Sequence, residues 1–249
     1  MYVVQEPLVF AAAQLAMLLQ IAHPEIAHEI YTSSTLQARL RDNMAYVKAL
    51  SEPSKQKTHL IVSGRGNISQ EETQRQLLMV ASIFVAVVKI RQDFFGGLMQ
   101  HDLDHAYTEI SQQATSVGVP TDSWPDTAEE FPEFWTDRMG SSAVATEEAR
   151  VIAEQILYPV DISAWMVLPS LLLRACMTFW LPIRLREKYR LQNTWVNWSV
   201  YRVSVLLVSW LYALLPLVCH SPCWSSWTDG RSARRMSVVD RSFMIGHDE

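Results

Sequence analysis

Apolar residues recur at helical spacing along most of the chain, and the first such run is the most apolar. Residues 8–22 contain only two polar side chains, Gln14 and Gln20. The run is shorter than the roughly 20 residues that a membrane-spanning helix requires, so it predicts a helix buried in a protein core. His23-Pro24 is expected to end it, because the residue before a proline avoids the α region and the proline suits the first turn of the next helix.

Several later segments carry an apolar stripe at intervals of three or four residues, which is the pattern of an amphipathic helix. Other local signals are typical of helix ends and breaks. They are a capping box at Ser69 and Glu72, a stop at Gly96-Gly97, an N-cap at Thr146, a stop at Pro159 and a kink or split at Pro169. With nine Trp and ten Met against only eight Gly, these patterns predict an all-α protein.

The last apolar segment, residues 195–218, needs separate treatment. Residues 203–219 carry no charge, but they include two serines and Pro216 and are at the lower edge of a membrane-spanning length. We predict a buried final helix here, with a membrane anchor as the alternative.

The sequence on either side of this segment is basic and polar. The basic residues before it are Arg184, Arg186, Lys188 and Arg190, and they favour peripheral contact with a membrane surface as a further possibility. After Ser225 the chain becomes polar and is expected to be disordered. We therefore predict a single helical domain over residues 1–224 and a polar tail over residues 225–249.

Composition and charge narrow the range of partners. The 249 residues carry a net charge of -5, whereas a nucleic-acid-binding protein needs a basic face, so a small or apolar partner is favoured. Three cysteines cannot form an even disulfide framework, and no basic region precedes the first apolar run, so no signal peptide is expected. We expect an intracellular protein, either cytoplasmic or peripherally associated with an internal membrane such as the endoplasmic reticulum.

Arg39 and Asn43 fall on the apolar stripe of residues 35–50, one helical turn apart. A guanidinium that faces a core is costly unless an anionic or polar group meets it, so a partner is expected. The partner is either a bound ligand or a carboxylate such as Glu25 or Glu29, unless the side chain reaches the surface. The sequence leaves these alternatives open.

His23 and His28 lie five residues apart on either side of the break at Pro24, a spacing that does not align them for a metal, so a structural or pocket-lining histidine is favoured there. Three other histidines are candidates for metal or cofactor binding. His59 begins the apolar run Leu60-Ile61-Val62 in the pattern H-x-x-V-x-G, and it is either a core histidine or a ligand. His101 and His105 are four residues apart on one predicted helix, a spacing that can bind a metal. Because the neighbouring apolar residues define the opposite side of that helix, a solvated position is favoured for both.

Taken in order, several short motifs resemble one known family. The motifs are Leu18-Leu19-Gln20-Ile21-Ala22-His23-Pro24, Arg39-Leu40 with Asn43, His59-Leu60-Ile61-Val62-Ser63-Gly64, Tyr107-Thr108-Glu109, Gly118-Val119-Pro120, residues 134–139 and Leu181-Pro182-Ile183-Arg184. Their succession over residues 7–220 is similar to that of the haem-dependent oxygenases that include the rubber-cleaving latex clearing proteins and the fungal oxygenase of the mycophenolic acid pathway.

This resemblance implies a globin-like helical bundle that holds haem b without a covalent bond. His59 matches the axial histidine of the family, which leaves the other axial position open for dioxygen. Arg39 matches a distal arginine that binds oxygen or a haem propionate, and Asn43 joins it as a candidate catalytic residue. The implied reaction is the cleavage or oxygenation of a carbon-carbon double bond in an apolar, isoprenoid or polyketide-derived substrate.

The chain departs from the family pattern at several positions. Asn43 stands where relatives often carry threonine, and Asp42 where the rubber-cleaving members carry lysine. The Tyr-x-Ala-x-Asp segment that usually follows Gly66 is absent. A carboxylate base is sometimes assigned in the family, and neither Glu25 nor Glu29 matches it well enough to be assigned that role. Two other functions therefore stay open: a nonhaem metal enzyme that uses His101 and His105, and a non-catalytic helical protein that binds a lipophilic ligand.

Overall fold

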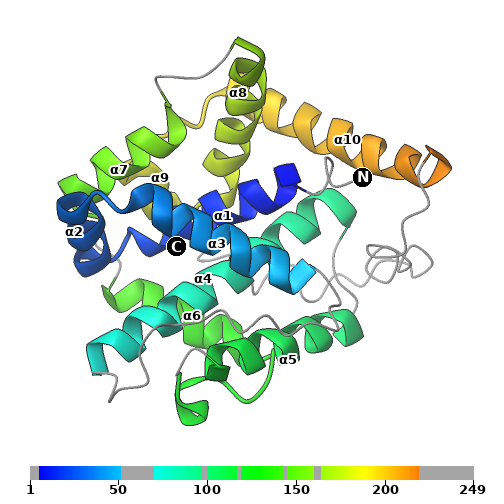
Figure 1. Cartoon of the computed structure of the whole chain (residues 1–249). Coiled ribbons are helices and arrows are strands. Elements are labelled where there is room, and N and C mark those ends of the chain that lie inside the picture. The colour runs from blue at the N-terminus through cyan, green and yellow to red at the C-terminus, as the bar shows by residue number, and fades with distance from the viewer. Residues whose placement is uncertain are drawn as a thin grey trace.

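The computed structural model describes residues 6–51, 70–96, 100–116, 119–142, 145–159 and 164–218, and these residues form helices and loops without a strand. The all-α, single-domain prediction is confirmed. The helices are α1 (Glu6–Gln20), α2 (Pro24–Ser33), α3 (Leu36–Ser51), α4 (Gln70–Phe95), α5 (Gln100–Ser116), the 3-10 turn η2 (Thr121–Ser123), α6 (Phe131–Ser142), α7 (Glu147–Leu157), α8 (Ala164–Trp180), α9 (Ile183–Lys188) and α10 (Trp195–Val218), as Figure 1 shows.

Helix α1 lies at the centre of the bundle. Every side chain from Ala11 to Ala22 is buried, as predicted for this apolar run. The helix packs mainly against α3 and α4, and Figure 1 shows it in the middle of the other helices. Tyr189 directly follows α9, and its hydroxyl donates a hydrogen bond of 2.9 Å to the Leu18 carbonyl. Distant parts of the chain therefore converge on α1.

The helix ends follow the predicted local signals where the structure describes them. The axes of α1 and α2 differ by 111°, and His23 at the break is extended while Pro24 begins α2. Gly96 adopts a left-handed φ of 82° immediately after α4, and the Thr146 hydroxyl accepts a 3.2 Å hydrogen bond from the Ala149 N–H. Pro169 lies inside α8 without splitting it. Ser69 and Gly97 lie outside the described residues.

An aromatic cluster packs α6 against α4 and α5. Phe131, at the start of α6, is fully buried, and its ring lies 4.8 Å from that of Phe84 on α4. The rings of Tyr107 on α5 and Trp124 are stacked with their centres 6.0 Å apart. The Tyr107 hydroxyl donates a hydrogen bond to the Pro125 carbonyl. These contacts fix α6 beside α4, where the cavity described below opens.

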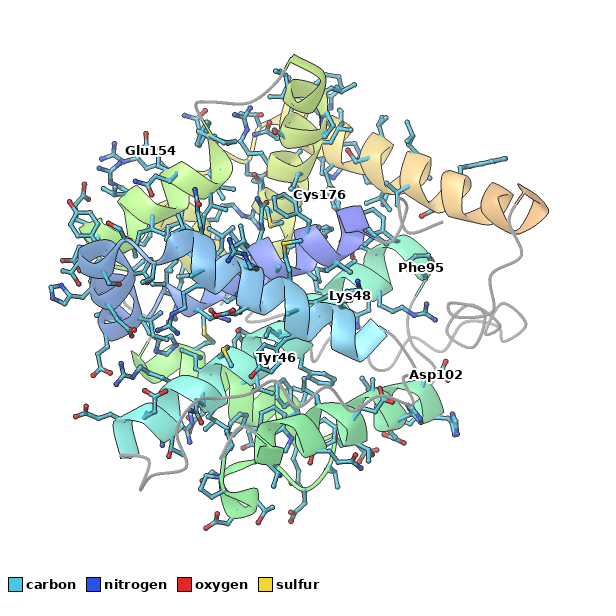
Figure 2. The ribbon with its side chains drawn as sticks, in the orientation of Figure 1. Tyr46, Lys48, Phe95, Asp102, Glu154 and Cys176 are labelled. Atoms are coloured by element: carbon cyan, nitrogen blue, oxygen red, sulfur yellow. The ribbon has the colours of Figure 1, made fainter. Side chains whose placement is uncertain are left out.

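A single carboxylate joins α4, α8 and α10. Asp93 on α4 accepts hydrogen bonds of 2.5 Å from the Trp180 indole N–H and the Tyr201 hydroxyl, and Lys89 lies 3.3 Å from its other oxygen. Cys176, buried on α8 and labelled in Figure 2, lies beside this group. Burial and the Asp93 carboxylate both raise the pKa of Tyr201, so its hydroxyl remains a proton donor.

Over residues 195–210, the part of α10 whose side chains the structure describes, the helix is buried on one side only, so the prediction of a buried final helix is half right there. Ser204 faces inward and is buried, and the Ser209 hydroxyl donates a 2.7 Å hydrogen bond to the Phe94 carbonyl. By contrast, Trp195 is 78% exposed and Trp210 is 66% exposed. None of the described helices alone combines the length and apolar composition of a membrane-spanning helix; the bent pair α1 and α2 does so only when joined.

Replacing Asp93 with alanine should lower the free energy of unfolding by about 2–4 kcal/mol, because the buried Trp180 indole N–H and the half-buried Tyr201 hydroxyl lose their acceptor. Asp104→Ala on the exposed side of α5 is the matched control and should cost less than about 0.5 kcal/mol. Urea unfolding monitored by circular dichroism measures both values. Equal losses in the two variants would show that the Asp93 contacts contribute no more than a surface carboxylate.

Candidate functional site

Arg39 on α3 is bound by a carboxylate of the neighbouring helix. Its Nη2 donates a 2.5 Å hydrogen bond to Glu29 on α2, and Arg75 on α4 donates to the other Glu29 oxygen at 3.1 Å. Burial raises the pKa of Glu29, but the charges and hydrogen bonds of both arginines outweigh this effect and hold the pKa below its ordinary value. Of the partners predicted for Arg39, the structure shows Glu29.

Asn43 is 1% exposed and belongs to a separate polar network. Its side-chain amide and that of Gln20 on α1 donate to each other at 3.3 Å, and Gln20 also donates to the Ser82 hydroxyl on α4 at 2.9 Å. Arg39 and Asn43 therefore share one side of α3 but contact different neighbours. Tyr46, also buried and labelled in Figure 2, continues that inward side.

Of the three candidate histidine ligands, the structure describes His101 and His105. His59 and the run that follows it lie outside the described residues, so its role as an axial ligand stays a prediction. The side chains of His101 and His105 are 87% and 62% exposed on α5, which confirms their predicted solvated position. In the part of the chain that the structure describes, no group of three or more His, Cys, Asp or Glu residues could hold a metal ion.

A cavity of about 380 Å³ opens between the start of α2, the first half of α4 and α6. Such a volume is typical of a small-molecule site. Its lining residues are His23, Pro24, Glu25, Ile26, Glu71, Gln74, Arg75, Leu77, Leu78, Ala81, Phe134, Trp135 and Arg138. The apolar residues come from α2, α4 and α6, and the polar groups of the wall are two arginines, two carboxylates, the Gln74 amide and the His23 imidazole.

Three polar atoms in the lining residues are buried and have no hydrogen-bond partner among the described residues. They are Nε2 of His23, Nε of Arg75 and Nε1 of Trp135. Burial, with a smaller contribution from the charge of Arg138, lowers the pKa of His23 to about 4, so the imidazole is neutral at physiological pH. A buried donor without a partner is costly, and a bound ligand is one way to offset that cost.

Arg138 adds a positive charge that no described carboxylate neutralises. It donates a hydrogen bond to the Gln74 side chain, and its guanidinium carbon lies 5.2 Å from the centre of the Phe134 ring. Neither contact removes its charge. The cavity therefore combines an apolar wall, a neutral imidazole, the carboxylates of Glu25 and Glu71, and a cation, Arg138, that makes no ion pair with a described carboxylate.

Comparison with known families matches this chain over most of its length. A family model described as "ER-bound oxygenase mpaB/B'/Rubber oxygenase, catalytic domain" matches residues 1–210. The chain belongs to this family. No curated protein and no solved structure matches it.

Membership in the mpaB and rubber oxygenase family confirms the resemblance that the sequence motifs indicate, and it makes this chain an oxygenase-type catalytic domain. The matched residues contain both the Arg39 and Glu29 ion pair and every residue that lines the cavity. Family membership does not assign a cofactor, a substrate or a role to any of these residues.

The cavity itself is the functional feature that sequence analysis missed. His23-Pro24 was identified as a helix break, and Phe134 and Trp135 lie in a recognised family motif. No local signal joins these residues to Arg75, because the cavity forms only when α2, α4 and α6 pack together. For the histidines at the break, the sequence favours a structural or pocket-lining role, and the structure places His23 in the cavity wall.

The low pKa of His23 predicts a defined loss of stability in mild acid. Because the unfolded imidazole binds a proton more readily than the folded one, the free energy of unfolding should fall as the pH is lowered from 6.5 to about 4, by up to about 3 kcal/mol. His23→Gln should remove this decrease, and His101→Gln should retain it. Urea unfolding at several pH values above 4.5, where the depressed pKa of Glu29 does not yet contribute, measures the slope. The same slope in His23→Gln and the unsubstituted protein would contradict the assignment.

Proposed function

We propose that this protein is a haem-b-dependent oxygenase that uses dioxygen to cleave or oxygenate a carbon-carbon double bond of an apolar, isoprenoid or polyketide-derived substrate. The family supports the oxygenase activity. The observation that carries the finer proposal is the apolar cavity whose wall contains a neutral, unpartnered imidazole. Such a cavity suits a lipophilic ligand with few polar atoms.

The groups around the cavity fit the chemistry of a haem. Arginines bind carboxylates such as haem propionates. Arg75 is already paired with Glu29 and Glu72, so Arg138 is the arginine of the cavity that would bind a propionate. Phe134, Leu77 and Leu78 provide apolar surface for a macrocycle or a hydrocarbon chain. We assign His59 as the axial ligand on the basis of the family motif. When bound, the haem would supply the centre that activates dioxygen.

The other roles follow from the contacts of α3. Glu29 fixes the Arg39 guanidinium through one nitrogen, which leaves its other N–H groups able to donate to oxygen or to a propionate. We propose Arg39 as the catalytic residue on this helix. Because both ends of the Asn43 amide already bond to Gln20, we propose that Asn43 positions α3 against α1 rather than touching the substrate.

The cavity walls favour an alkene over a polar substrate. Leu77, Leu78 and Ala81 on α4 line the cavity with hydrocarbon side chains. The transfer of apolar surface from water to contact with such side chains is favourable. In the cleavage reaction both atoms of dioxygen are used: the double bond breaks, and each of its carbons becomes a carbonyl carbon. His23 can donate one hydrogen bond to an oxygen without a change in its charge, which suits it to orient an oxygenated ligand.

The proposed location is intracellular, on an internal membrane. The family description includes the words "ER-bound", and we propose the endoplasmic reticulum for this chain as well. A membrane location supplies lipophilic substrates directly, because such molecules partition into the bilayer.

Reconstitution with haemin tests the proposed cofactor and its ligand. The full-length chain should retain haem near one equivalent after desalting and show a Soret band, and His59→Ala should lose most of it. His101→Ala and His105→Ala are the matched controls and should retain haem like the unsubstituted protein. The absorption spectrum and a pyridine haemochrome assay measure occupancy, while circular dichroism confirms folding.

Two results would contradict this proposal. Full haem occupancy in His59→Ala would remove the axial assignment. A colourless, folded protein that instead binds a metal lost in His105→Ala would support the nonhaem alternative.

A further inference from the structure

One face of α10 is apolar but uncovered by any described part of the chain. Its exposed apolar residues are Trp195, Val196, Trp198, Val203, Leu206, Leu207 and Trp210. At about 100° per residue, these side chains share roughly half of the helix circumference over four turns, and Arg202 is the one charged residue among them. Soluble proteins rarely expose a continuous apolar face of this length, which marks it as an interaction surface.

The opposite face of α10 is well anchored, so the exposed face is a stable feature of the fold. Tyr201 stacks on Phe179 of α8 with ring centres 4.8 Å apart and donates its hydroxyl hydrogen to Asp93. Ser204 is buried, and Ser209 bonds to the backbone of α4. These contacts fix which side of α10 turns outward.

Helix α8 contributes a second set of exposed apolar side chains. Val167, Leu168 and Leu171 lie in its first half, and Leu168 is 64% exposed. Figure 1 shows α10 extending outward from the body of the bundle, with α8 packed against it. We name the seven exposed apolar residues of α10 the outer apolar face.

Charge and aromatic content identify the partner. Tryptophans occur near both ends of the described part of this face, and tryptophan is enriched where protein meets the headgroup region of a bilayer. From Leu181 to Trp210 the sequence holds five basic residues and one acidic residue. Of the basic residues, Arg184, Lys188, Arg190 and Arg202 are exposed. Of these cations, Arg202 lies on the exposed face of α10, and neither residues 164–180 nor residues 195–210 contain an acidic residue. The same face of a second copy would therefore offer no carboxylate to Arg202, whereas anionic lipid would neutralise it.

We propose that the outer apolar face binds the surface of a bilayer that contains anionic phospholipid, with α10 lying in the headgroup plane. The helix does not qualify as a membrane-spanning segment on its own, and its inner side is committed to α4 and α8. An interfacial helix needs only one apolar side, which is what α10 presents. The surface uses residues separate from those that line the cavity, so it stands without the proposed haem.

Vesicle sedimentation tests this surface with the full-length protein. The protein should pellet with vesicles of phosphatidylcholine and phosphatidylserine, and less with phosphatidylcholine alone. The double variant Val203→Glu with Leu207→Glu should bind at least tenfold more weakly. Added salt should weaken the preference for the anionic vesicles, because it screens the contribution of the cations.

The matched control carries the same two charges elsewhere. Thr108→Glu with Gln112→Glu places them one turn apart on exposed positions of α5, and it should pellet like the unsubstituted protein. Circular dichroism and haem retention, measured on all three proteins, separate a folding defect or a failure of the haem proposal from a loss of membrane binding.

Two outcomes would overturn the proposal. Equal sedimentation of the α10 variant and the unsubstituted protein would show that the outer apolar face does not contact lipid. The second outcome is that the unsubstituted protein does not sediment with vesicles and is dimeric by size-exclusion chromatography, whereas the α10 variant is monomeric. That result would show that the outer apolar face binds a second copy of the chain.

Discussion

The burial of every side chain of α1 from Ala11 to Gln20 is the constraint on which the rest of the structure depends. A helix without a polar side must be covered all round, and α3 and α4 provide the main contacts. Its last polar residue, Gln20, is then forced into the interior, where Asn43 and Ser82 satisfy it. One turn later the chain breaks at His23-Pro24 and the cavity opens. The position of the candidate site thus follows from the end of the core helix.

Some polar groups near this site form ion pairs with each other, and others have buried atoms without a hydrogen-bond partner among the described residues. Glu29 binds two arginines, which explains a guanidinium on the apolar stripe of α3 without any ligand. The cavity differs, because His23, Trp135 and Arg75 keep buried atoms without partners among the described residues. The contrast places the capacity for ligand binding between α2, α4 and α6 rather than at Arg39 alone.

Features set by neighbouring residues could be predicted from the sequence, and features set by packing could not. The break at Pro24, the stop at Gly96 and the cap at Thr146 depend on local backbone chemistry and were predicted. The partner of Arg39 stayed open between Glu25 and Glu29 because it depends on the angle between two helices. For α10, periodicity indicates which residues share a face, but only packing decides which face is covered. The prediction for His59 lies outside the described residues and rests on the family motif.

The central claim is that this helical domain uses dioxygen on an alkene. The most direct measurement is the mass of the product formed when the haem-reconstituted protein meets a prenylated aromatic substrate under isotopically labelled dioxygen. For the cleavage reaction the account predicts two carbonyl fragments, each with one oxygen atom from the labelled gas before exchange with water. Substrate recovered unchanged, without oxygen uptake by a haem-loaded and folded protein, would contradict it for this substrate class. Oxygen that comes only from water, in fragments reduced to alcohols during the reaction so that their carbonyls cannot exchange, would contradict the oxygenase reaction itself.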